Sequence, residues 1–147
     1  MILEKGLNRF KDSEIQEDTY NQTKAKLQIE EYLRVDIETM PMMSIWDWEI
    51  YKDGYLVAIG EYRRRFCKFG TFKDFQFSKK KFLTMKEKGK ADGVYAYMFV
   101  EFDDLFLYFN IKGEPETKIM RRNHEVRTEE CVCIPNQDFR YLSQIEI

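Results

Sequence analysis

Residues 47–63 read Asp-Trp-Glu-Ile-Tyr-Lys-Asp-Gly-Tyr-Leu-Val-Ala-Ile-Gly-Glu-Tyr-Arg, and this stretch decides the fold of the chain. Two apolar runs typical of β-strands flank a Lys-Asp-Gly turn, which predicts a β-hairpin. Asp47 stands in the first strand, Glu61 near the end of the second, and Arg63 two residues later. Two carboxylates beside a cationic side chain can hold a divalent metal, as phosphodiester hydrolysis requires. The alternative is a plain amphipathic hairpin whose exposed face carries charges.

The loop length decides whether the two acids meet, because side chains alternate between the faces of a strand. A two-residue loop would place Glu61 opposite Trp46, with the acids on opposite faces. A three-residue loop over residues 52–54, with its glycine in the left-handed conformation of a bulge, would place Asp47 opposite Ile59. Glu61 would then be the diagonal neighbour of Asp47 on the same face, roughly 7–8 Å away. The glycine at the third loop position favours this second register.

The order of the elements around the hairpin resembles the PD-(D/E)XK nuclease superfamily. The similar parts are a leading helix that ends near Leu33, motif strands at residues 46–50 and 57–65, a helix at residues 77–82, and a closing segment at residues 127–139. The resemblance covers residues 22–142 and is greatest to small single-domain members from phages. It implies an α/β (α+β) fold with a restriction-endonuclease-like core, in which helices flank a mixed central β-sheet.

The resemblance also implies a metal site and an activity. Asp47 and Glu61 would hold Mg²⁺ or Mn²⁺, with the carbonyl of Tyr62 as a backbone ligand. Gln22, on the leading helix, would support the water beside the metal, although an exposed helical glutamine is the simpler interpretation. The implied activity is that of a Mg²⁺-dependent DNA endonuclease or junction resolvase.

One residue departs from the superfamily pattern, because Arg63 stands where the catalytic lysine is expected. Arginine keeps the positive charge, but it stays protonated and is bulkier and forked. Arg63 could suffice as an electrostatic clamp, or Lys81 could supply a lysine from the following helix. The third alternative is that catalysis is lost, leaving a protein of the same fold that binds nucleic acid or a host defence protein. A subunit of a larger phage recombination or packaging complex is a further interpretation.

The charges of the chain are strongly segregated. Residues 63–90 contain eleven Lys and Arg residues against two acids, a net charge of +9, which leaves −11 for the rest because the whole chain carries −2. Such segregation predicts a polyanion-binding face beside the candidate site, with a merely solvated helix face as the alternative. The residues expected to contact DNA are Arg64, Arg65, Lys68, Lys79, Lys80 and Lys81. Five phenylalanines between residues 66 and 77 could stack on unpaired bases or, more simply, fill the core.

The remaining pattern gives the scaffold. Residues 13–34 read as a helix, with Ala25, Ile29 and Leu33 on one face. Ser78 is expected to cap a second helix that runs to residue 88, with Gly89 at its C-terminal cap. Residues 94–102, 105–111 and 131–134 read as strands.

Composition bounds the biological setting. A length of 147 residues predicts one domain, residues 1–147. Neither a membrane-spanning run nor a signal peptide is expected, and the three cysteines are predicted to be ordinary thiols in a reducing cytoplasm. The expected partner is DNA, with a homodimer or a host or phage protein partner as further alternatives.

Overall fold

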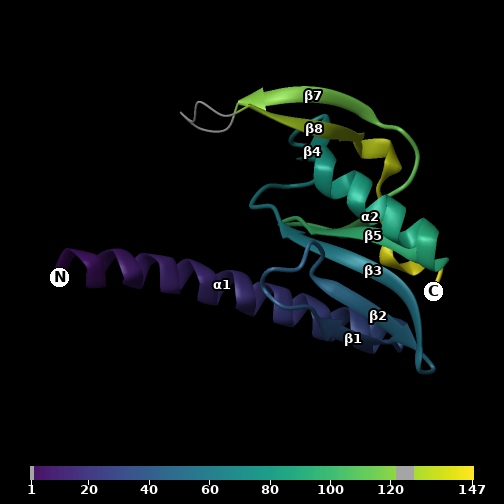
Figure 1. Cartoon of the computed structure of the whole chain (residues 1–147), viewed down its shortest axis with the longest axis horizontal. Helices are drawn as coiled ribbons and strands as arrows, with labels where there is room; N and C mark the ends of the chain where they lie inside the picture. Colours follow the sequence, from purple (N-terminus) through teal and green to yellow (C-terminus); the bar gives the residue numbers. More distant parts are fainter. Residues whose placement is uncertain (1, 122–127) are drawn as a thin grey trace. The chain divides into compact units, whose positions relative to one another are not determined.

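The computed structural model describes residues 2–121 and 128–147, with side chains for residues 18–120 and 128–147. The chain forms two compact units, Met1–Val35 and Asp36–Ile147. The first unit is helix α1, Ile2–Leu33 (Figure 1). It begins eleven residues before the expected start at Ser13, in a stretch that contains no proline. Within the described part of the chain, no helix is long and apolar enough to cross a membrane.

The second unit contains a mixed six-stranded sheet, which confirms the predicted fold class. Strands β3 and β5 are parallel and all other neighbours are antiparallel. In sheet order the strands are β1 (Asp36–Thr39), β2 (Trp48–Lys52), β3 (Tyr55–Arg64), β5 (Tyr95–Glu101), β6 (Phe106–Asn110) and β9 (Arg140–Tyr141). Short 3₁₀ helices at Asn136–Asp138 and Leu142–Gln144 flank β9.

The unit also contains a second, three-stranded antiparallel sheet, which was not predicted from the sequence. Its order is β4 (Asp74–Ser78), β8 (Thr128–Pro135) and β7 (Glu116–Arg121). Strand β8, the 3₁₀ helix after it and its C-cap Phe139 form the closing segment 127–139, apart from Arg127, which lies outside the described residues. Phe75 and Phe77 alternate inward on β4 and are buried, so two of the five phenylalanines belong to the core.

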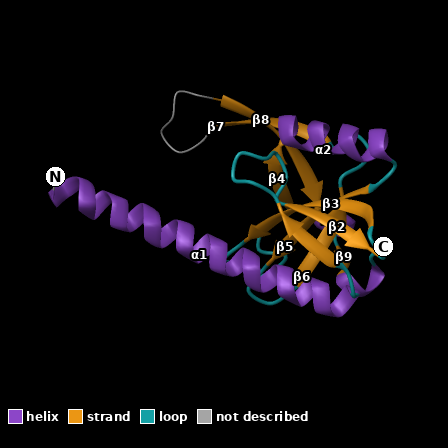
Figure 2. Cartoon of the chain, turned by 60° about the horizontal axis from the view of Figure 1, so that its bottom comes forward, coloured by secondary structure: helices purple, strands orange, loops and turns teal. Residues whose placement is uncertain are grey.

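Helix α2 (Lys79–Asp92) packs against strands of both sheets (Figures 1 and 2). Its first residue follows the N-cap Ser78, whose hydroxyl accepts a hydrogen bond from Lys81 N, as predicted. The predicted C-cap is wrong, because α2 continues to Asp92 and ends at Gly93 with φ 66°. Gly89 serves close packing instead: a Cβ there would lie 2.9 Å from the carbonyl oxygen of Val94.

The loop between β2 and β3 is shorter than predicted. Lys52 pairs with Tyr55, so the loop is the two-residue turn Asp53-Gly54, whose φ angles are 51° and 83°. Positive φ at both central positions is the type I′ conformation, which matches the twist of a hairpin. The prediction of a three-residue loop, with Asp47 opposite Ile59, is therefore wrong.

A β-bulge in β3 brings the two acids level by another route. The register shift leaves Val57 as the extra residue, between the pairs Ile50–Ala58 and Tyr51–Leu56. Beyond this bulge Trp48 pairs with Gly60. Since a bulge shifts the register by one residue, the next position brings Asp47 level with Glu61.

Candidate active site

Glu61 is the one charged side chain that is buried among the described residues, with no exposed surface. It lies on β3 and pairs with Met98 of the parallel neighbour β5. Ile59, two residues earlier and therefore on the same face, belongs to the core that also contains Phe82 of α2. The sequence thus places a carboxylate at the edge of an apolar layer, where water cannot solvate it.

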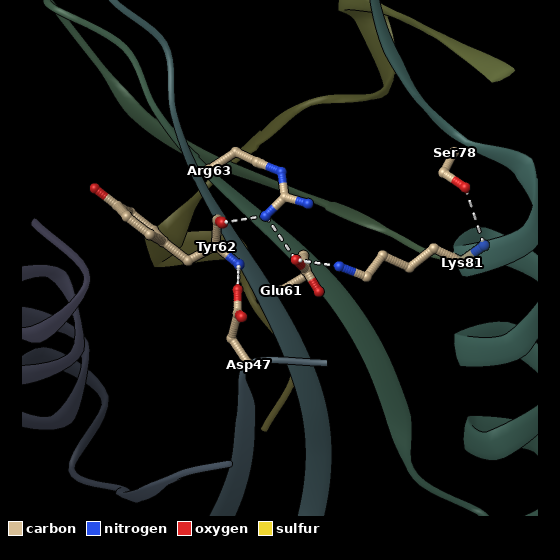
Figure 3. A network of polar contacts seen from close by, with 6 residues as sticks. All are labelled: Asp47, Glu61, Tyr62, Arg63, Ser78 and Lys81. Atoms are coloured by element: carbon tan, nitrogen blue, oxygen red, sulfur yellow. Dashed lines mark hydrogen bonds and ion pairs between the residues drawn. The ribbon is translucent and has the colours of Figure 1, made fainter. Parts of the chain in front are cut away.

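Two cations share one oxygen of this carboxylate (Figure 3). Arg63 Nη1 lies 2.6 Å from Glu61 Oε1, and Lys81 Nζ lies 2.8 Å from the same atom. The side chains of Arg63 and Lys81 are 39% and 26% exposed, so both can also reach solvent. The other oxygen, Oε2, is buried and has no hydrogen-bond partner among the described residues. The lysine predicted to come from the following helix is therefore beside the motif acid.

The pKa of Glu61 lies above the ordinary value for a glutamate. Burial is the largest cause, because it disfavours the charged form. The positive charge of Arg63 opposes this effect, the negative charge of Asp47 adds to it, and Lys81 opposes it by hydrogen bond and charge. The loss of hydration therefore changes the pKa of Glu61 more than the two cations do.

Glu61→Gln should raise the melting temperature at neutral pH when divalent ions are absent. Because the pKa of Glu61 is raised on folding, the folded protein holds this proton more tightly than the unfolded chain. Stability is then favoured at low pH and falls as pH rises above the ordinary carboxyl range, near about 4.3. Glutamine cannot ionise, so thermal unfolding curves should show the variant above wild type at neutral pH and level with it at low pH. A lower melting temperature at neutral pH would mean that the two ion pairs outweigh burial.

Asp47 holds the backbone on both sides of Glu61. Its N–H donates to the carbonyl of Gly60 at 3.0 Å, and its Oδ2 accepts from the N–H of Tyr62 at 2.9 Å. These contacts fix the Asp47 carboxylate at the start of β2, beside the strand that carries Glu61 (Figure 3). Burial is the main cause of the raised pKa of Glu61, and the negative charge of the nearby Asp47 adds to it.

A cavity of about 390 Å³ lies over the two cations. Arg63 and Lys81 line it together with Lys80, which is exposed on α2. The cavity also includes Glu129 of β8, a carboxylate to which sequence reasoning gave no role. Only its presence in the closing segment pointed to it. The remaining lining residues are Ile45, Ser78 and Thr84.

The residues present fit a divalent ion. A buried carboxylate oxygen without a partner is costly, and hard cations such as Mg²⁺ prefer oxygen ligands. Glu61 Oε2 is such an atom. Arg63 Nη1 contacts two of the three predicted ligands, since it also donates to the carbonyl of Tyr62 at 3.0 Å, so its guanidinium must move aside for the ion. No cluster of three or more His, Cys, Asp or Glu side chains suited to a metal occurs in the described ranges, so water would complete the coordination of such an ion.

The residues expected to contact DNA differ in their surroundings. Arg64 forms an ion pair with Asp103 at 2.6 Å, and Lys79 forms one with Glu130 at 2.9 Å. Arg65 lies over the ring of Phe75. Lys68 and Lys80 are exposed.

Gln22, which was predicted to support the water beside the metal, is on α1, in the other unit of the chain. Its role stays a prediction.

A mixed sheet with an acid before one strand, a second acid on the next and cations beside it defines the PD-(D/E)XK class of nuclease folds. The family model described as "Phage putative PDDEXK endonuclease" matches residues 9–141. The chain belongs to this family, and the resemblance drawn from its motifs is confirmed. No curated protein matches the sequence.

Proposed function

We propose that this protein is a divalent-metal-dependent DNA endonuclease whose reaction centre is Glu61. The observation that carries the proposal is the Glu61 carboxylate, which is fully buried, contacts Lys81 and Arg63 through one oxygen and leaves the other without a partner. An ion pair with a purely structural role would not require Glu61 Oε2 to be buried without a hydrogen-bond partner. Membership of a family of phage endonucleases supports the same conclusion.

Each residue of the site has a role in this proposal. Asp47, Glu61 and the carbonyl of Tyr62 hold Mg²⁺ or Mn²⁺, which when bound activates water and offsets charge on the phosphate. Arg63 and Lys81 bind the oxygens of the scissile phosphate and stabilise the negative charge that grows on them. Lys81 can also give up and take back a proton, which Arg63 cannot readily do.

A second candidate function is supported by the position of the Arg63 guanidinium. Nη1 bonds both Glu61 Oε1 and the carbonyl of Tyr62, so a permanent protein cation could replace the metal. The protein would then bind nucleic acid, or a host defence protein, without cutting.

A cleavage assay separates the two functions. Pure protein is incubated with duplex, branched and single-stranded DNA, with Mg²⁺ or Mn²⁺ and then with EDTA. The endonuclease should cut at least one substrate only with the metal, and preference for the branched form would identify a junction resolvase. DNA binding without cleavage of any substrate would favour the second function.

Lys80→Ala should weaken DNA binding and flatten its salt dependence. Lys80 is exposed and lines the cavity over the site, so it is free to bind a phosphate. Losing one phosphate contact lowers the log–log salt slope by about 0.9 for duplex DNA. Lys79→Ala is the matched control, because Lys79 already pairs with Glu130 and should change the slope less. Gel shifts across a salt series measure this slope. If wild type and Lys80→Ala have equal log–log salt slopes, Lys80 does not contact the DNA.

A further inference from the structure

A second cavity, of about 350 Å³, opens where the chain leaves β3. Its walls come from residues 65–72 after β3, from β4, from Phe102 after β5 and from Asn136 after β8. The volume falls in the range of small-molecule sites, roughly 300–1,000 Å³. None of the residues that form the Glu61 site lines this cavity, so it is a separate feature of the fold.

The cavity is held in shape by hydrogen bonds of its own loop. The carbonyl of Cys67 accepts from the N–H of Asp103 at 3.0 Å, and the N–H of Phe69 donates to Asp104 at 2.9 Å. Further along, the side-chain amide of Asn136 donates to the carbonyl of Phe72 at 2.8 Å. Because the loop is fixed at several points, a ligand would meet a preformed site and would not have to order the loop.

The walls combine flat apolar surfaces with polar groups. Phe75 and Phe102 line the cavity, and Phe72 stands at it with 67% of its surface exposed. The exposed ring of Phe72 can stack on a nucleobase, whereas the ring of Phe75 is buried beneath Arg65. Asp74 and Gln76 also line the cavity, and they lie on β4, which is an edge strand of its sheet. A carboxylate, an amide and an open strand edge can pair with the hydrogen-bonding edge of a base.

Charge and position link the cavity to the nuclease site. Arg65 and the exposed Lys68 line it, so a polyanion is favoured over a neutral apolar ligand. Arg65 continues the β3 ladder, with its N–H donating to Glu101 O at 2.9 Å. It lies four positions after Glu61, or roughly 13 Å further along at 3.3 Å per residue. A DNA strand with its scissile phosphate at Glu61 therefore reaches the cavity within a few nucleotides.

We propose that this cavity binds an unstacked nucleobase of the DNA strand that is cut at Glu61. The inference rests on the proposed nuclease function and adds a base-binding subsite to it. Phe72 stacks on the base, Arg65 and Lys68 hold the adjoining phosphates, and Asp74 accepts a hydrogen bond from an exocyclic amino group. The subsite therefore favours cytosine, adenine or guanine over thymine, which has no such group.

The test uses the full chain in EDTA, so that binding is measured without cleavage. The probe is a short single-stranded oligonucleotide that carries one 2-aminopurine, read by anisotropy for affinity and by emission for the stacking state of the base. Phe72→Ala should weaken binding by about 5- to 150-fold, the equivalent of losing one base stack. It should also change the emission of the bound probe. Asp74→Asn should reduce the preference for cytosine over thymine in unlabelled competitors.

Phe66→Ala is the matched control. Phe66 is 70% exposed, close to the value for Phe72, but it packs on Arg64 and does not line the cavity. Its replacement should leave affinity and emission unchanged. If wild-type protein binds the probe and Phe72→Ala binds equally well, the base subsite is overturned while the nuclease proposal stands. If wild-type protein does not bind the probe but cuts duplex or branched DNA with the metal, the base subsite is likewise overturned while the nuclease proposal stands. If it neither binds nor cuts any of the three DNA substrates, the proposed function itself fails.

Discussion

Glu61→Gln and Asp47→Asn should each reduce DNA cleavage by at least about 10³-fold. A divalent ion stabilises the charge of such a reaction by several kcal/mol, and each 1.4 kcal/mol is a factor of ten in rate. Glutamine keeps the shape of Glu61 but removes the negative charge that would hold the ion. In Asp47→Asn the acceptor for the N–H of Tyr62 can be kept, because an amide oxygen can replace Oδ2. The expected loss is thus a loss of charge and not of fold.

Melting curves provide the second readout for these variants. Mg²⁺ or Mn²⁺ should raise the melting temperature of wild type, because ligands that bind only the folded state stabilise it. Neither variant should show this rise. Glu38→Gln is the control, since Glu38 is exposed on the edge strand β1 and should leave both cleavage and the metal effect intact. Cleavage at the wild-type rate by Glu61→Gln would show that Glu61 is not part of the catalytic site.

The hairpin shows what local sequence can and cannot predict. The runs on each side of Asp53-Gly54 correctly predict two strands joined by a turn, but the turn has two residues and not the three that were predicted. The register was not predicted in this way, because the hydrophobic pattern of the two strands did not indicate the bulge at Val57. The same distinction holds on α2. The Ser78 cap is a local hydrogen bond and was predicted, whereas the role of Gly89 depends on the approach of Val94.

The candidate site divides along the same line. Charge and spacing singled out Asp47, Glu61 and Arg63, and the resemblance to the superfamily added Lys81. The fold brings Arg63 and Lys81 to the carboxylate of Glu61. Burial of Glu61 was not foreseen, because it depends on α2 lying across β3. The cavity beside Phe72 was missed for a related reason. Residues 65–76 mix aromatic, basic and polar types, and only the folded β4 and its neighbours separate core from surface.

Lys81→Met should reduce cleavage by about 10²- to 10⁴-fold, the usual contribution of a positioned acid–base group. Lys81 Nζ lies 2.8 Å from Glu61 Oε1, the oxygen that Arg63 also contacts, so the lysine from the helix can take the place of the motif lysine. Methionine keeps most of the length of the side chain and removes its charge. Lys88→Met is the control, since Lys88 lies about two turns further along α2 and pairs with Asp92.

Arg63→Lys in the Lys81→Met background tests whether the two positions share one function. A lysine at position 63 restores the superfamily pattern, and its ammonium can reach the carboxylate that Arg63 contacts now. We therefore expect the double variant to cut DNA faster than Lys81→Met alone in single-turnover assays. Full activity of Lys81→Met would show instead that Arg63 suffices as an electrostatic clamp. Rates for the double variant no higher than for Lys81→Met would show that Lys81 acts from its own position on α2 and cannot be replaced from β3.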